Sequence, residues 1–297
     1  MSSLSALIRR NTKLFFRDKG MFFTSLITPV ILLVLYVTFL GSIFQRTFES
    51  VIPVELNAPD GIINALVGGQ LLSSLLAVCC VTVAFMSNML MVQDKVTGAR
   101  SDLTMTPVKR SILALSYYIS TAISTLIICV LATAVGFIYL ASSGWYITFS
   151  DVLLIFADVF LLVMFGTALS SIVNCFLSSQ GQMTAVGTII SAGYGFVCGA
   201  YMPISEFSDG LQKVLSFLPG TYGTSLIRNH IMSGAFDELS NIGVPAEEIN
   251  AIKDAIDCNF YFFGDKVEQP VMYMIIGGSV VVLIAAYILL NILKRKN

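Results

Sequence analysis

Apolar residues in this sequence gather into long blocks, and shorter polar segments separate the blocks. A helix that crosses a membrane needs about 20 consecutive, mostly apolar residues, and six stretches of the sequence reach that length. We therefore predict an all-α integral membrane protein with six transmembrane helices. The predicted spans are residues 21–44, 62–90, 112–141, 152–177, 183–201 and 271–293.

Composition strengthens this prediction. Hydrophobic residues make up 56% of the 297 residues and charged residues only 12%, whereas a soluble domain carries roughly 25% charged residues on average. The outer surface of the folded chain is therefore expected to face lipid. We treat residues 1–297 as a single transmembrane domain.

The formal net charge of −1 hides a strong asymmetry between the two sides of the predicted membrane domain. Segments that lie on one side hold most of the basic residues, and the opposite segments hold most of the acids. The basic residues on that side are Arg9, Arg10, Lys13, Arg17, Lys19, Lys95, Arg100, Lys109, Arg110, Lys294, Arg295 and Lys296. Because cytoplasmic segments carry the excess of Lys and Arg, we predict a multi-pass protein of the cytoplasmic (plasma) membrane with both termini in the cytoplasm.

Few residues of the predicted spans carry ionisable groups, which ion-coupled transporters use to bind their coupling ion. Asp158 is the one candidate, and its closeness to Trp145 and Asp151 also allows a place at the outer interface. The single histidine, His230, is expected to lie outside the membrane and cannot build a metal site or a catalytic triad by itself. Five of the six cysteines lie in apolar stretches, and only Cys258 lies in a polar one.

No pattern of an enzyme or a cofactor site stands out. The cysteines form no C-x-x-C pair, and the phosphate-binding pattern G-x-x-x-x-G-K-[ST] is absent. We therefore predict that the chain is not an enzyme, that it holds no metal or other cofactor, and that any energy for transport comes from another chain.

Residues 3–18 are predicted to form an amphipathic helix, with leucine, isoleucine and phenylalanine on one arc and Arg9, Arg10 and Lys13 on the other. A basic amphipathic helix of this kind lies in the inner headgroup layer. Two interpretations stay open: a plain membrane anchor, and a lever between a cytoplasmic partner and the first span.

The cytoplasmic segment 93–107 mixes both charge signs, bends at Gly98 and ends at a proline. It is similar to the cytoplasmic loop of ABC-2 type transporter permeases, whose pattern is roughly E-R-x-x-G-T-x-E-x-L-x-x-x-P. The matching residues are Asp94, Lys95, Gly98, Asp102, Leu103 and Pro107. Aspartate replaces both glutamates, and Ala99 replaces the threonine.

This resemblance implies a coupling helix that docks on a P-loop ATP-binding subunit, which would itself bind ATP and magnesium. The docking residues it implies are Asp94, Lys95, Gly98, Arg100 and Asp102, together with Arg9, Arg10 and Lys13 of the N-terminal helix.

Residues 203–233 carry the second resemblance to ABC-2 permeases, a pattern of glycine, two prolines, a tyrosine and an arginine. Because Pro203 and Pro219 suit the first turn of a helix, we predict a re-entrant helical hairpin between spans five and six; a plain surface hairpin is the alternative. The resemblance implies an outer gate formed by Pro203, Pro219, Tyr222 and Arg228, although Arg228 also has the length to reach the headgroups.

Residues 236–268 match the family least and are predicted to form an acidic extracellular insertion that contains a helix starting at Pro245. The family resemblance as a whole implies the permease subunit of a bacterial ABC exporter. It implies a dimer with a second copy or a related permease, with lipid as a partner and without nucleic acid.

Two substrate classes fit the family. We favour an amphipathic drug, antibiotic or antimicrobial peptide, as in multidrug resistance, over a lipid-linked glycan or teichoic-acid-like polymer. A hypothesis of another class is a membrane sensor or scaffold that transports nothing.

Overall fold

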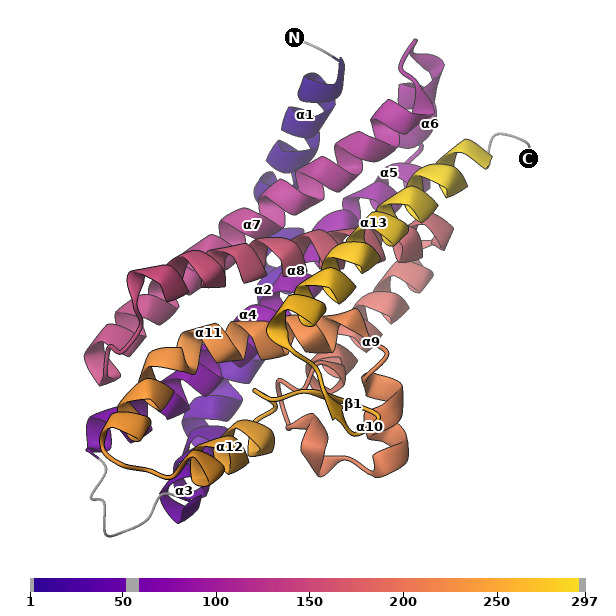
Figure 1. Cartoon of the computed structure of the whole chain (residues 1–297). Helices are drawn as coiled ribbons and strands as arrows, with labels where there is room; N and C mark the ends of the chain where they lie inside the picture. Colours follow the sequence, from indigo (N-terminus) through magenta and orange to yellow (C-terminus); the bar gives the residue numbers. More distant parts are fainter. Residues whose placement is uncertain (1–2, 52–58, 294–297) are drawn as a thin grey trace.

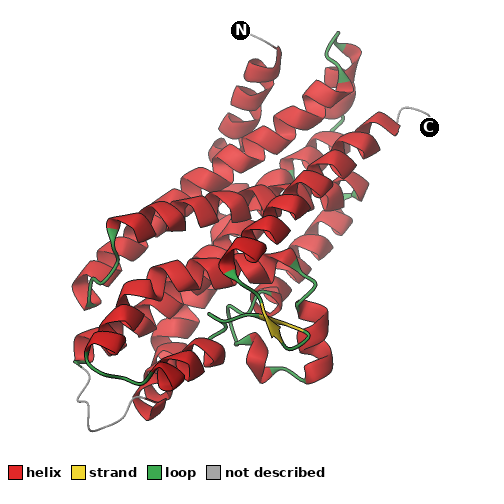
Figure 2. Cartoon of the chain, viewed as in Figure 1, coloured by secondary structure: helices red, strands yellow, loops and turns green. Residues whose placement is uncertain are grey.

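The computed structural model describes residues 3–51 and 59–293. Helices dominate the described residues, and the strands among them are a two-residue antiparallel pair (Figure 2). The predicted all-α fold class is confirmed.

The elements carry the labels of Figure 1. The longer helices are α1 (Ser3–Arg17), α2 (Lys19–Leu35), α3 (Gly41–Val51), α4 (Asp60–Asn88), α7 (Arg110–Ser143), α8 (Phe149–Phe176), α9 (Gln180–Val197), α11 (Pro219–Asn241) and α13 (Gln269–Leu293). The shorter elements are the π-helical turn Tyr36–Leu40, α5 (Leu90–Val96), α6 (Ala99–Met105), the 3₁₀ turn Ile204–Glu206, α10 (Asp209–Leu215), α12 (Ala246–Ala255), β1 (Tyr261–Phe262) and β2 (Asp265–Lys266).

Among the described residues, five helical stretches are long and apolar enough to cross a membrane. They are Lys19–Glu49, Asp60–Val96, Arg110–Ser143, Phe149–Phe176 and Gln269–Ile292. The remaining predicted span forms α9, whose 18 residues extend roughly 27 Å at 1.5 Å per residue, close to the ~30 Å of a hydrocarbon core. The chain is therefore a multi-pass membrane protein, and the sixth crossing stays a prediction.

Helix α4 forms the centre of the bundle. It packs against α2, α7, α8 and α11, and most of its residues are buried. The backbones come close because small residues lie at the crossing: a Cβ on Gly166 of α8 would lie 2.7 Å from the carbonyl oxygen of Cys80. The outer helices differ, since side chains such as Val37 (78% exposed) and Val281 (68% exposed) point away from the bundle, as lipid-facing residues do.

Different segments of the chain lie at the two ends of the bundle. Helices α1 and α6 and the last turn of α13 lie at one end, called here the inner end, and α3, α10 and α12 lie at the other, the outer end (Figure 1). Three basic segments of the sequence were predicted to share one side, and the parts of them that the structure describes do so. Lys294, Arg295 and Lys296 lie outside the described residues.

The outer segment between α9 and α13 is more extensively helical than predicted. Pro219 occupies the first turn of α11, as expected, and Pro203 precedes the 3₁₀ turn. Helix α11 is not a short hairpin arm, because its 23 residues pack against α4, α8 and α13 and continue to Asn241. The predicted boundary between the hairpin (203–233) and the insertion (236–268) therefore falls inside one helix. Helix α12 follows Pro245, as predicted, whereas the β1–β2 hairpin was not foreseen.

Candidate functional site

Asp94, predicted as a docking residue of the cytoplasmic loop, points into the bundle. Arg10 of α1 donates two hydrogen bonds to its carboxylate, at 2.7 and 3.0 Å, and the Tyr117 hydroxyl of α7 donates a third at 2.5 Å. The hydrogen bonds that the guanidinium donates to Asp94 raise the pKa of Arg10. Asp94 is only 5% exposed, so this pair fixes α1 to the end of α5 and to α7. The Asp94 carboxylate is thus turned inward, whereas the Arg10 side chain stays 31% exposed.

Lys95 also has an internal role. Its ammonium donates hydrogen bonds to three carbonyl oxygens at the end of α8, those of Asn174 (2.9 Å), Cys175 (2.9 Å) and Leu177 (2.8 Å). The last carbonyls of a helix have no partner within the helix and carry a partial negative charge. Lys95 therefore caps α8 and joins it to α5.

The rest of the predicted coupling segment is better placed to meet a partner. Gly98 forms the expected bend, with φ at +82°, a conformation that glycine adopts at little cost. Helix α6 follows it, with Asp102 exposed and Met105 85% exposed. Arg100 faces inward and lies 3.4 Å from the Asn291 side-chain oxygen of α13.

Helix α1 packs along α7 and buries Leu7, Asn11 and Phe15. Arg9 and Lys13 remain exposed at the inner end, where they stay available to a partner or to headgroups. The contact of α1 with the headgroup layer stays a prediction.

Arg228 is the centre of the outer end. It is 1% exposed, so the interpretation that it reaches the headgroups is wrong. It donates to the carbonyl oxygens of Gly199 (2.5 Å) and Ile256 (2.7 Å), to the Ser74 hydroxyl (3.4 Å) and to the Asp257 carboxylate (3.5 Å). Arg228 on α11 therefore holds together α4, the end of α9 and the segment after α12.

Asp257 extends this cluster to the proposed gate. Its carboxylate accepts the backbone N–H of Ile204 at 2.6 Å and that of Ser205 at 3.3 Å, directly after Pro203. Burial raises the pKa of Asp257, and the charge of Arg228 opposes the rise. The Tyr222 side chain is buried and donates to the Ser216 carbonyl at 2.6 Å, which closes α10 onto α11. The four predicted gate residues thus lie in one tightly bonded region.

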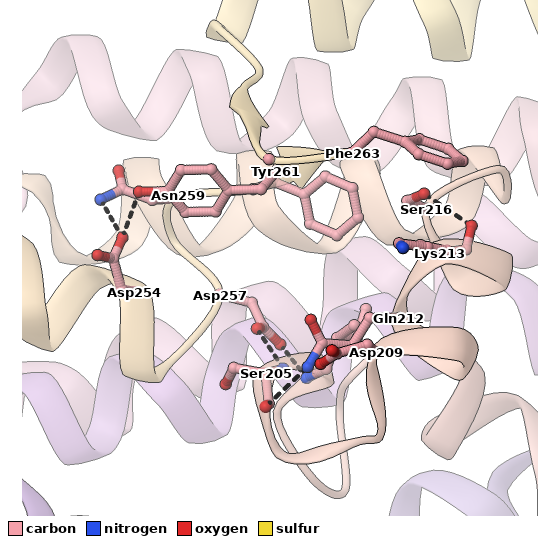
Figure 3. A pocket seen from close by; sticks show the side chains of 13 residues that line it. Ser205, Asp209, Gln212, Lys213, Ser216, Asp254, Asp257, Asn259, Tyr261 and Phe263 are labelled. Atoms are coloured by element: carbon pink, nitrogen blue, oxygen red, sulfur yellow. Dashed lines mark hydrogen bonds between the residues drawn. The ribbon is translucent and has the colours of Figure 1, made fainter.

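A polar cavity of about 460 Å³ opens beside this cluster, between α10 and the segment after α12. Figure 3 shows Asp257, Ser205 and Asp209 on one side and Tyr261 and Phe263 across from them. Asp254, at the rim, accepts hydrogen bonds from Asn259 (2.7 Å) and from the Tyr261 hydroxyl (3.0 Å). Two of the carboxylates that line the cavity, Asp254 and Asp257, thus already accept hydrogen bonds from neighbouring groups.

His230 and Asp158 form a cluster that the sequence did not reveal. The His230 ring nitrogen lies 2.6 Å from the Asp158 carboxylate, and the Tyr273 hydroxyl donates to the same carboxylate. Asp158 is 2% and His230 6% exposed, so the helices of the bundle enclose both side chains, and neither is the isolated group that the sequence suggested. The places of His230 outside the membrane and of Asp158 at the outer interface stay predictions. The cluster joins α8, α11 and α13.

A second cavity, of about 240 Å³, lies between α8, α9 and α11 and is lined almost entirely by apolar side chains. Phe165 and Leu169 come from α8, and Ile189 and Ile190 come from α9. We call it the apolar hollow. Among the described residues, no group of three His, Cys, Asp or Glu side chains is placed to hold a metal ion.

Lipid-facing outer helices and buried ion pairs that join helices define a polytopic membrane protein. A family model described as "ABC-2 family transporter protein" matches residues 50–287, which is most of the chain. The chain therefore belongs to the ABC-2 transporter family and is a permease of an ABC transporter. Such permeases associate with an ATP-binding subunit. Comparison with curated proteins gives no match.

Proposed function

We propose that the chain is the membrane subunit of an ATP-driven exporter that moves an amphipathic drug, antibiotic or peptide out across the cytoplasmic membrane of a bacterium. It would act as a dimer of permeases, with α9 as the sixth crossing and both termini in the cytoplasm. ATP and magnesium would be bound by the partner subunit. This chain would contribute no catalytic residue and no cofactor.

The proposed substrate class rests on the lining of the apolar hollow. Its walls offer hydrophobic and aromatic side chains, the lining typical of sites for small apolar or amphipathic molecules. A polar glycan would gain little there, because its hydroxyls would lose water without finding partners.

One residue allows a sharp test of the hollow. A Cβ on Gly193, which lines it, would meet no atom within 4 Å, so Gly193→Trp fills the hollow without a clash at the backbone. Gly181, near the start of the same helix, is equally open and lies outside the hollow, which makes Gly181→Trp the matched control.

The permease would be reconstituted with its ATP-binding subunit in vesicles, and ATP hydrolysis stimulated by amphipathic peptides and dyes would be measured. We expect Gly193→Trp to lose stimulation and Gly181→Trp to keep it. Full stimulation of Gly193→Trp would contradict a substrate route through the hollow.

The exposed face of α6 supports the docking proposal. Because Asp94 and Lys95 are engaged inside the bundle, their charge reversal would disturb the fold, and Asp102 gives the cleaner test. Asp102→Arg is expected to weaken copurification of the ATP-binding subunit, whereas Asp237→Arg, at an exposed acid on α11, is not. Unchanged copurification of Asp102→Arg would overturn this docking surface, and failure of the wild type to copurify any ATPase would favour a sensor or scaffold.

A second substrate class has one observation in its favour. Phe217, Phe262 and Phe263 form an aromatic cluster at the outer end, with ring centroids 4.9–5.8 Å apart, and two of the rings are more than half exposed. Exposed rings of this kind can stack on sugars. A lipid-linked glycan or teichoic-acid-like polymer is therefore the alternative, and glycan-stimulated ATP hydrolysis in the same vesicles would favour it.

A further inference from the structure

A third cavity, of about 440 Å³, lies at the inner end of the bundle. It is bounded by α6, the first turn of α7 and the last turns of α8 and α13. Three basic residues line it, Lys95, Arg100 and Arg110, and its described lining contains no carboxylate. We call it the inner basic cavity.

No carboxylate in the described part of the chain forms an ion pair with either arginine of this cavity. The Lys95 ammonium donates to carbonyl oxygens at the end of α8, and its charge offsets the partial negative charge of that helix end. Neither Arg100 nor Arg110 takes part in the ion pairs that the structure describes. Arg110 is also the first residue of α7, a helix start without a side-chain cap, and free N–H groups there add to the attraction for an anion.

The other walls of the cavity combine hydroxyl groups with apolar side chains. Ser101, Thr104 and Ser178 provide hydroxyls; those of Thr104 and Ser178 already donate to the Ser101 carbonyl and to Gln182, so Ser101 is the one of the three that can donate to a ligand. Leu113 and Phe176 provide apolar surface, and Phe176 is 59% exposed. The cavity thus changes from charged to apolar where α7 and α8 enter their apolar spans.

We propose that the inner basic cavity binds the phosphate of an anionic phospholipid headgroup, with Arg100 and Arg110 as its ligands. Guanidinium groups match phosphate oxygens with paired hydrogen bonds, and basic pockets between membrane helices on the cytoplasmic side select such headgroups. Inorganic phosphate shares this charge chemistry. The apolar walls favour the lipid, because Leu113 and Phe176 can contact its glycerol and acyl carbons.

Such a lipid would have a consequence for α6. Arg100 belongs to α6 and Arg110 to α7, so one phosphate would join the two helices across the loop between them. The lipid would then add a second connection that positions the Asp102 face of α6, beside the hydrogen bond from Arg100 to Asn291. This goes beyond the proposed function, since the lipid site does not depend on which substrate is moved.

The test uses the full chain, purified in a neutral detergent and stripped of lipid. Native mass spectrometry would measure retention of dioleoylphosphatidylglycerol against dioleoylphosphatidylcholine, and thermal unfolding would be followed with each lipid and with inorganic phosphate. The variant is Arg100→Gln with Arg110→Gln. The control is Arg9→Gln with Lys13→Gln, which removes two exposed charges from α1 at the same end.

We expect wild type and control to retain the anionic lipid over the zwitterionic one and the cavity variant to bind it about 30-fold more weakly, since each cation near the surface contributes roughly fivefold. Equal retention of the two lipids by the wild type, or undiminished binding by the variant, would overturn the proposal. Stabilisation by inorganic phosphate without any by the anionic lipid would overturn the lipid as its source. If the double variant is unstable, Arg110→Gln alone, at an exposed position, gives the same comparison.

Discussion

Replacing Arg228 with methionine is the most informative perturbation of the outer end. Methionine keeps the apolar stem and removes the guanidinium, so the packing on α4 is largely preserved. The change leaves the carbonyl oxygens of Gly199 and Ile256 without their donor and the Asp257 carboxylate without its countercharge.

The expected cost follows from burial. Both partners are almost fully enclosed, with side chains 1% and 9% exposed, and removing one partner of a buried ion pair costs about 3–5 kcal/mol. The two backbone N–H groups that Asp257 keeps place the value towards the lower end of that range. A loss of this size corresponds to a drop in melting temperature on the order of 10 °C.

The protein provides its own reporter for this measurement. All six cysteines are buried, and none forms a disulfide in the described part of the chain, so a thiol-reactive fluorescent dye reacts only as the bundle opens. Melting curves of the purified protein in detergent would compare Arg228→Met with Arg46→Met. Arg46 is an exposed arginine on α3 at the same end and serves as the matched control.

A double-mutant cycle with Asp257→Asn then isolates the pair. Asparagine tolerates the left-handed backbone of this position, where φ is +54°, and needs no countercharge. The double variant should be more stable than the sum of the single losses predicts, by about 0.5–3 kcal/mol. If Arg228→Met has the same melting temperature as Arg46→Met, or if the stability losses of Arg228→Met and Asp257→Asn simply add, Arg228 does not hold the outer end together.

Three further outcomes are expected. Gly98→Ala should cost about 1 kcal/mol of folding free energy, because alanine is strained at positive φ, whereas Gly181→Ala should not destabilise the protein. Melting curves with the thiol dye would compare the two variants, and equal stability would contradict a requirement for glycine at position 98. His230→Ala should cost about 3–5 kcal/mol of folding free energy, because it leaves Asp158 buried without this partner. His230→Gln should cost clearly less, since the glutamine amide can still donate to Asp158. Equal losses would count against a stabilising hydrogen bond between His230 and Asp158. Burial raises the pKa of Cys258 to about 12, so peptide mapping should find it unlabelled by maleimide in the native protein at pH 7 and labelled after denaturation; rapid native labelling would show that the segment after α12 opens.

The apolar blocks sufficed to predict the helices because bilayer thickness fixes the length of a span. The predicted and observed bounds of α7, 112–141 and Arg110–Ser143, differ by two residues at each end. Span five was harder to predict. Its glycines and polar residues give α9 only 18 residues, and its packing depends on neighbours that periodicity does not reveal.

The charged residues illustrate the limit of sequence reasoning. Asp94 and Lys95 sit in a polar segment that looks like surface, yet their partners come from α1, α7 and α8, which are distant in the chain. In the same way, Asp158 and His230 are separated by 72 positions, and each looked isolated by itself. The number of ionisable groups in the spans was countable, but their pairing depends on how helices pack, which no local pattern encodes.

The stretch from Asp60 to Val96 is the element that both arginine clusters share. Ser74 receives Arg228 well inside α4, and Asp94 receives Arg10 in α5, at the inner end of the stretch. Twenty residues of helix separate them, about 30 Å, which is the thickness of the hydrocarbon core. The turn at Met89 separates α5 from α4, so the stretch is a stiff, enclosed element with one joint near its inner end. Force on α1 at that end would therefore reach Ser74 and Arg228 through one helical element and its single joint.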